Sequence, residues 1–307
     1  MAARYPSTVM VSVVCPWDDN EQLDEAAFRH EIDHALNAGF RHVYVFGTAG
    51  EGYGVDTARF RRVVEVFTDQ MRTVEGARAM VGVIGLSTGN VVERIGIAHA
   101  MGVREFQISF PIWQTLTDPE VLTFFRDVCL SFPDSLFMHY NTGRVGRILN
   151  GHHYRPVIDA IPNIVATKTM TSDGLIIASV VRDAPELTHF LSETAIADGS
   201  LYGQVGLLAT YGALAPKKCW AVLNAGNQGR HREAAELGGW FDRLGREIFD
   251  PLMADRRIDG AYDKLIEKLS PGQEAFPLRM LSPYRWLSDA EFRHAQQTLR
   301  ERFPDCE

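Results

Sequence analysis

The sequence has few cysteines, no long apolar run and no basic excess, and each absence excludes a class of protein. Its four cysteines among 307 residues stand far apart and form no C-x-x-C pair, at positions 15, 129, 219 and 306. This spacing argues against a zinc ribbon or a disulfide framework and indicates buried thiols in a reducing compartment. No stretch approaches the roughly 20 apolar residues of a membrane span, and the N-terminus lacks a signal-peptide pattern. We therefore expect a cytoplasmic protein without a membrane partner.

The charge balance is acidic. Lys and Arg number 31 against 39 Asp and Glu, which gives a formal net charge of −8. Nucleic-acid-binding domains more often carry a basic face or stripe, so we expect no nucleic-acid partner. The hydrophobic fraction of 46% is enough for a large core.

Eight short apolar runs alternate with helix-length segments. Their near-continuous apolarity is typical of strands buried on both faces, as in a parallel sheet. The runs are 9–15, 42–47, 79–85, 105–110, 135–141, 164–170, 188–193 and 206–211, and helical patterns include 24–38, 57–75, 89–101, 118–131 and 150–160. Such an alternation indicates a closed barrel or a doubly wound sheet.

A weak internal repeat favours the barrel. The pattern around Gly39 recurs around Gly102, 63 residues later, which corresponds to two βα units of about 31 residues. Both glycines are placed to end helices in the left-handed conformation. We therefore predict a (β/α)8 barrel, the α/β fold in which eight strands and helices alternate.

After about residue 212 the pattern is helical only. Segments 213–226, 230–250, 258–270 and 288–303 have no strand between them, and Ser288 and Glu291 form a capping box at the start of the last one. We predict a barrel domain at 1–226 and a helical extension at 227–307 that packs on it.

A lysine and a tyrosine lie within adjacent predicted strands. Lys168 interrupts the apolar run 164–170, where lysine is depleted and rarely buried. Taken alone, it is as readily a strand-end lysine that reaches solvent or pairs with a carboxylate. Tyr140 precedes it by close to one βα unit, so both should lie at one height. A buried amine can attack a carbonyl, and a neighbouring phenol can move the protons that this reaction requires.

A glycine-rich turn follows the second predicted strand. It reads Gly-Thr-Ala-Gly-Glu-Gly at 47–52. Its backbone N–H groups could bind an anion such as the carboxylate of a 2-oxo acid, and Thr48 could relay a proton with Tyr140. A plain tight turn is the alternative interpretation.

These residues carry a family resemblance. The G-T-A-G-E turn at 47–51, Y-N at 140–141 and the strand lysine at 168 are similar to the dihydrodipicolinate synthase / N-acetylneuraminate lyase family of class I aldolases. The resemblance implies that Lys168 forms a Schiff base with a 2-oxo acid and that Tyr140 transfers protons. Thr48, with the backbone of Ala49 and Gly50, would hold the substrate carboxylate. It implies small-molecule partners, a 2-oxo acid and an aldehyde, and a homo-oligomer, a dimer or a tetramer. The mechanism needs no metal or organic cofactor.

The sequence departs from the family pattern at three places. Ala49 replaces a hydroxyl residue of G-T-T-G-E, and the loop after Asn141 is one residue short and lacks the proline of Y-N-x-P-x-R, which leaves the position of Arg144 open. Ile112-Trp113 stands where dihydrodipicolinate synthases have two tyrosines. True dihydrodipicolinate synthase activity is therefore not expected.

The same departures indicate a branch of the family. Phe110-Pro111-Ile112-Trp113 resembles the P-M-W segment of the hydratase-aldolases, and Ser192-Glu193 resembles their H-E. An indole at the pocket mouth favours a flat or apolar substrate, although Trp113 could equally be core packing. Lys168, Tyr140 and Thr48 are the predicted catalytic residues. Beside them, we predict that substrate is bound by Ala49, Gly50, Arg144, Trp113, Glu193 and Leu208.

Other functions are weighed against this one. A 2-keto-3-deoxy sugar acid dehydratase or aldolase would use the same Schiff base, and a silent family member could serve as a 2-oxo-acid sensor. The H-E-x-x-H pattern at 30–34 suggests zinc, but its histidines fall opposite the apolar helix face, which we expect to be solvent-exposed. The glycines at 50, 52 and 54 lack the spacing of a dinucleotide loop.

Overall fold

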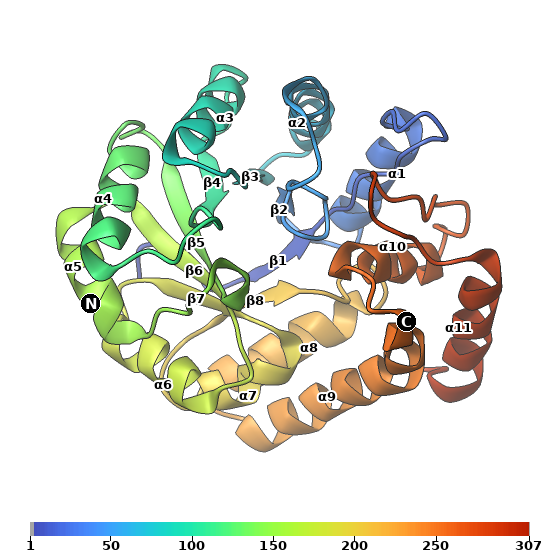
Figure 1. Cartoon of the computed structure of the whole chain (residues 1–307). Coiled ribbons are helices and arrows are strands. Elements are labelled where there is room, and N and C mark those ends of the chain that lie inside the picture. The colour runs from blue at the N-terminus through green and yellow to red at the C-terminus, as the bar shows by residue number, and fades with distance from the viewer. Residues whose placement is uncertain (1–2, 307) are drawn as a thin grey trace.

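Eight parallel strands close into a barrel in sequence order, with β8 paired to β1 (Figure 1). The computed structural model describes residues 3–306, apart from the side chains of residues 254 and 255. The strands are β1 (Val9–Ser12), β2 (His42–Val45), β3 (Arg78–Val83), β4 (Glu105–Ile108), β5 (Leu136–Thr142), β6 (Ile164–Met170), β7 (Thr188–Leu191) and β8 (Gly206–Ala209). The predicted (β/α)8 barrel is confirmed.

Each apolar run overlaps one strand, but six of the runs end two or three residues beyond their strand. At these positions the chain leaves the sheet and bends into the loop above it. Phe46, directly after β2, has a φ of 70° that no strand can hold. Apolarity therefore located the strands, whereas their ends are set by turn geometry.

The barrel helices run along the outside of the strands (Figure 1). They are α1 (Glu25–Asn37), α2 (Thr57–Met71), α3 (Thr88–Ala100), α4 (Asp118–Cys129), α5 (Gly151–Ala160), α6 (Gly174–Asp183), α7 (Ile196–Gly199) and α8 (Pro216–Asn227). Side chains cap many of their first turns; for example, Asp24 accepts from the amide of Ala27. Gly39 and Gly102 each have a φ of 93°, as expected of glycines that end helices.

The C-terminal extension packs against the outside of the barrel, with α9 along the bottom of Figure 1 and α10 and α11 at the right. It comprises α9 (His231–Leu244), a π-helical turn η3 (Gly245–Phe249), a 3-10 segment η4 (Asp250–Asp255), α10 (Asp259–Leu269) and α11 (Asp289–Arg302). The capping box of Ser288 and Glu291 is present at the start of α11. No helix in the described range is long and apolar enough to cross a bilayer.

Two apolar layers lie on the two faces of the sheet. The outer layer fills the space between strands and helices, and all four cysteines are buried. The inner layer fills the barrel and includes Met10, Tyr44, Met80, Met138, Ala166, Phe190 and Leu208. Because side chains on a strand alternate between faces, residues two positions from these also point into the barrel.

Candidate active site

Strand register places Lys168 beside Tyr140. The two residues are paired directly between β5 and β6. Each lies two positions after a residue of the inner layer, Met138 on β5 and Ala166 on β6, so both side chains point into the barrel. Both stand toward the carboxyl ends of their strands, the end at which barrel enzymes carry their active sites.

Lys168 is a buried lysine without a polar partner. Its side chain is 8% exposed, and it makes no hydrogen bond or ion pair with any described residue. The Nζ atom lies 4.4 Å from the centroid of the Tyr140 ring and 5.5 Å from that of Tyr44. The structure thus shows neither the solvent-directed nor the carboxylate-paired lysine that the sequence left open.

Thr48 and Tyr140 come together as the sequence suggested. Their side-chain oxygens are 3.4 Å apart, a distance at which either hydroxyl can donate to the other. Both residues are buried, at 7% and 5% exposure. Two hydroxyls therefore stand in series beside the amine of Lys168, an arrangement that can pass a proton.

The glycine turn presents two backbone donors. Within the described chain, neither the amide of Ala49 nor that of Gly50 donates a hydrogen bond. A side chain at position 50 would bring its Cβ within 2.7 Å of the Phe46 nitrogen, so the turn needs glycine there. Glu51 has a φ of 57°, which shows how sharply the turn is wound. Its free amides suit an anion.

The extension holds this turn in place, which the sequence did not reveal. The fully buried carboxylate of Glu51 accepts from the indole of Trp17 at 2.7 Å and pairs with Lys264 of α10 at 2.7 Å. Its other oxygen accepts from the amide of Leu281 at 2.8 Å. No motif signals these contacts, because Lys264 and Leu281 belong to the last part of the chain and Glu51 to the first.

Glu193 and Leu208, which the sequence assigned to substrate binding, are both buried, and that role stays a prediction. The Glu193 carboxylate accepts from the amides of Thr210 and Tyr211, at 2.6 and 2.9 Å, and so joins the ends of β7 and β8. Burial raises the pKa of this carboxyl, and those hydrogen bonds and the charge of Lys168 oppose the rise. Leu208 is 4% exposed in the inner layer, opposite Met10 of β1.

Arg144 and Trp113 lie farther out. The Arg144 guanidinium pairs with Asp259 at the start of α10, at 2.5 Å. Trp113 is 88% exposed, so the interpretation of this indole as core packing is wrong. Whether either residue binds substrate stays a prediction.

The H-E-x-x-H histidines lie on the solvent side of the helix only in part: His30 is exposed, as expected, whereas His34 is partly covered. His34 is 24% exposed, with its Nδ1 3.7 Å from the carboxylate of Glu267 on α10. His30 Nδ1 lies 3.0 Å from the side-chain oxygen of Gln273. The extension therefore contacts both histidines without burying either one. Among the described residues, no three His, Cys, Asp or Glu side chains group as metal ligands.

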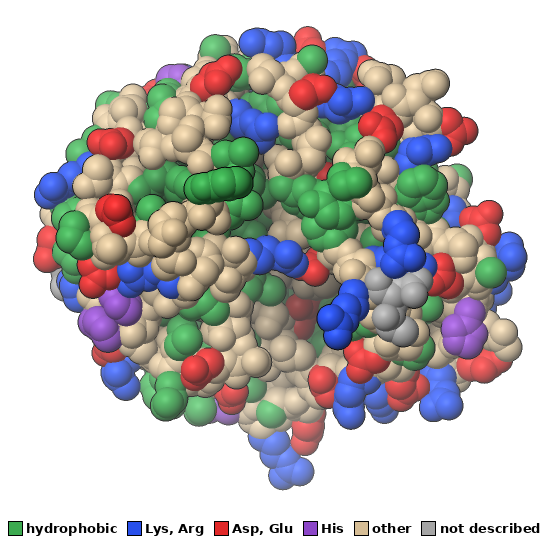
Figure 2. All heavy atoms as spheres, in the orientation of Figure 1, with side chains coloured by type: hydrophobic (Ala, Val, Ile, Leu, Met, Phe, Trp, Pro, Cys, Tyr) green, Lys and Arg blue, Asp and Glu red, His purple; other side chains and the backbone are tan. Residues whose placement is uncertain are grey.

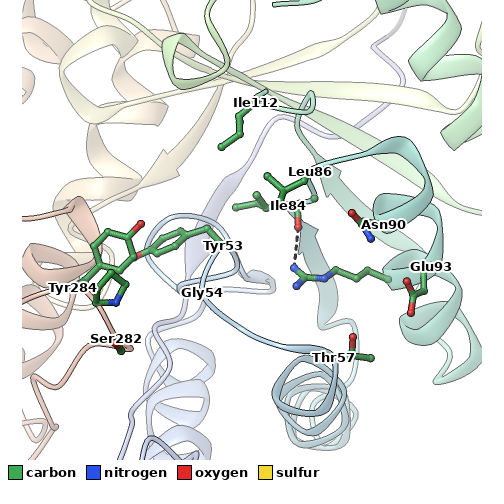
Figure 3. Close-up of a pocket in the computed structure, with 13 residues that line it drawn as sticks. Tyr53, Gly54, Thr57, Ile84, Leu86, Asn90, Glu93, Ile112, Ser282 and Tyr284 are labelled. Carbon is green, nitrogen blue, oxygen red and sulfur yellow. Dashed lines mark hydrogen bonds between the residues drawn. The ribbon is translucent and has the colours of Figure 1, made fainter. Parts of the chain in front are cut away.

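A cavity of about 570 Å³ lies beside the site (Figure 3). Tyr53 and Tyr284 form one wall, Ile112 and Leu86 another, and the dashed bond marks Arg94 donating to the Ile84 carbonyl at 2.8 Å. Lys168 does not line it. In the orientation of Figure 1, Figure 2 shows a hollow near the centre of the molecule, where acidic and basic side chains lie close together.

The chain is similar to proteins of known name along most of its length. Residues 5–253 match the dihydrodipicolinate synthetase family. A 4-hydroxy-tetrahydrodipicolinate synthase of Bartonella quintana is 22% identical over 242 residues, 78% of this chain and 82% of that protein. One of Phenylobacterium zucineum is 25% identical over 253 residues, which cover 80% and 82%.

Solved structures share the fold. YagE, a prophage protein of E. coli K12 in complex with pyruvate, has a TM-score of 0.83 at 17% identity, covering 96% of this chain and 98% of its own. The N-acetylneuraminate lyase of Proteus mirabilis has a TM-score of 0.82 at 16% identity, with the same coverage of 96% and 98%.

Proposed function

The chain belongs to the dihydrodipicolinate synthetase family, and we propose that it is a class I lyase whose Lys168 forms a Schiff base with pyruvate or a related 2-oxo acid. The observation that carries the proposal is Lys168 itself: a buried amine, in register with Tyr140 and without a polar partner among the described residues. Keeping an amine in this setting costs stability, and such costs concentrate at functional sites.

The surrounding groups support each step of the reaction. The substrate carboxylate would bind the free amides of Ala49 and Gly50 and the hydroxyl of Thr48. The amine of Lys168 adds to the C2 carbonyl and gives a carbinolamine. Tyr140 and Thr48 carry a proton from the nitrogen to the hydroxyl, which leaves as water. The resulting iminium then accepts the electron pair of a bond broken at C3.

The proposal does not extend to dihydrodipicolinate synthesis, although the relatives above carry the synthase name. Ala49 offers no hydroxyl, and Trp113 offers no phenol. Arg144, which the family resemblance would assign to substrate, is already paired with Asp259. The second substrate is therefore proposed to be an aldehyde of another kind. The protein itself is proposed to be a dimer or a tetramer.

Borohydride trapping with pyruvate tests the mechanism. We expect a reduced covalent adduct in the intact mass, mapped by peptide analysis to Lys168 and absent from Lys168→Ala. Lys217→Ala, which removes an exposed lysine of α8, is the matched control and should label like the parent. An unlabelled parent protein, or an adduct on a different lysine, would contradict the proposal. Turnover with a panel of 2-oxo acids separates an enzyme from a silent sensor.

A further inference from the structure

The start of α10 closes over the carboxyl end of the barrel. A Cβ at Gly260 would lie 3.1 Å from the carbonyl oxygen of Thr48, so the helix approaches the turn about as closely as glycine allows. Asp259 pairs with Arg144, which follows β5, and Lys264 pairs with Glu51 in the glycine turn. Three successive contacts thus fix the orientation of this helix above the site.

Asp263 lies on the face of α10 that these contacts turn toward the barrel. It follows Asp259 by four residues and Gly260 by three, the spacings that bring helical side chains onto one face. It makes no hydrogen bond or ion pair with any residue in the described range, and its side chain is only partly exposed. An acid held over an active site without a partner is costly, and this calls for a functional explanation.

The charged groups that act on Asp263 come from α10 and from the carboxyl ends of the strands, which agrees with the side of α10 that the helix contacts turn toward the barrel. Burial, the first cause, and the charge of Asp259 raise its pKa to about 7, while Lys168 opposes the rise. Because charges interact appreciably only over short distances, the groups that act on Asp263 or respond to it outline its neighbourhood. They are Asp259 of α10, Lys168 of β6, Arg144 of η1 (Gly143–Val145), Glu193 of η2 (Glu193–Ala195), Tyr44 of β2, and Tyr53 and Tyr211 in the loops.

We propose that Asp263 is a catalytic base of this site and removes the C3 proton of the Schiff-base intermediate. The inference rests on the proposed function. With the substrate carboxylate at the glycine turn and C2 bonded to Lys168, C3 faces the remaining side, which α10 covers. The carboxylate takes the proton, the C–H pair forms the C2=C3 bond, and the iminium nitrogen receives the former C=N π pair. A neutral enamine and a protonated Asp263 result, and the reverse step returns the proton to C3.

Exchange of the pyruvate methyl protons in D2O, followed by NMR, tests this role without a second substrate. Normalised to the borohydride-trapped adduct, the exchange rate should fall about 10²-fold in Asp263→Asn, as expected when a positioned base is lost. Adduct formation at Lys168 should persist. Glu236→Gln makes the same chemical change at an exposed residue of α9 and should exchange like the parent. Asp263→Glu, which keeps a carboxylate, should recover part of the rate.

The pH profile and the stability of the variant separate catalysis from structure. Parent exchange should rise with pH through about 7, as the carboxylate forms, and this limb should be absent from Asp263→Asn. A carboxyl whose pKa is raised by folding destabilises the fold once ionised, so the Asn variant should melt no lower than the parent at pH 8. Unchanged exchange, or a lower Tm with proportional loss of adduct, would overturn the role of Asp263. An unlabelled parent protein would instead refute the Schiff base itself.

Discussion

The two ends of the barrel differ in whether they leave buried polar groups without a partner. At the amino end, the Tyr5 hydroxyl donates to Glu105 at 2.6 Å and lies 3.0 Å from His42, and Arg78 donates to the other carboxylate oxygen at 2.6 Å. Every member of that cluster has a partner. At the carboxyl end, no described residue bonds the side chain of Lys168, and the buried hydroxyl of Tyr44 has no partner either.

This difference separates stability from function. Satisfied buried networks rigidify a fold, whereas a buried group left without a partner costs free energy. In (β/α)8 barrels the amino end serves stability and the carboxyl end serves chemistry. Substitutions at the amino end should therefore change unfolding and spare the reaction, and substitutions at the carboxyl end should do the reverse.

The largest expected effect lies at the carboxyl end. Tyr140→Phe should slow formation of the borohydride-trapped pyruvate adduct by about 10²-fold, equivalent to about 2.7 kcal/mol of barrier, because the proton shuttle is lost. Rapid-quench trapping measures this rate. The matched control is Tyr202→Phe, which alters a 45% exposed phenol and should label at the parent rate. Equal rates for all three proteins would remove Tyr140 from the mechanism.

Much of the fold and part of this end were predictable from the sequence. Apolar runs identify all eight strands, since a strand buried on both faces has few polar positions. The step from Tyr140 to Lys168 is close to one βα unit, and the observed register pairs the two residues directly. Sequence spacing is thus enough to predict which residues of consecutive strands lie side by side.

The contribution of the extension was not predictable. Asp263 and Lys264 are far from the glycine turn in the sequence, and nothing in the local sequence specifies how α10 docks on it. The same reason explains why His34 is less exposed than its helix pattern predicted: its Nδ1 lies 3.7 Å from the carboxylate of Glu267 on α10. Polar contacts between distant segments follow from tertiary packing, which hydrophobic periodicity does not encode.

A smaller effect should distinguish Tyr5 from Tyr44, two of the buried tyrosines of the barrel interior. Tyr5→Phe should lower the free energy of unfolding by about 2 kcal/mol, because it removes a hydrogen bond to a charged carboxylate. Tyr44→Phe removes a hydroxyl that has no partner and should change stability by less than about 0.5 kcal/mol, or raise it. Urea denaturation measures both. Equal losses of unfolding free energy in the two variants would mean that the partnered hydroxyl of Tyr5 stabilises the fold no more than the unpartnered hydroxyl of Tyr44.

The last expected effect depends on pH and concerns the barrel wall between the two ends. His139 and His189 lie on β5 and β7 beside the inward-facing Tyr140 and Phe190, so their rings face the helices. Burial lowers the pKa of His139 to about 3 and that of His189 to about 4. Below pH 6.5 these two histidines bind protons in the unfolded chain but stay neutral in the folded chain. The free energy of unfolding therefore falls as pH decreases toward 4. Each histidine should contribute up to about 1.4 kcal/mol per pH unit in this window.

His139→Phe should reduce the slope of unfolding free energy against pH by one proton, whereas Tyr44→Phe should keep the parent slope. A parent slope in His139→Phe would show that this imidazole titrates normally in the fold.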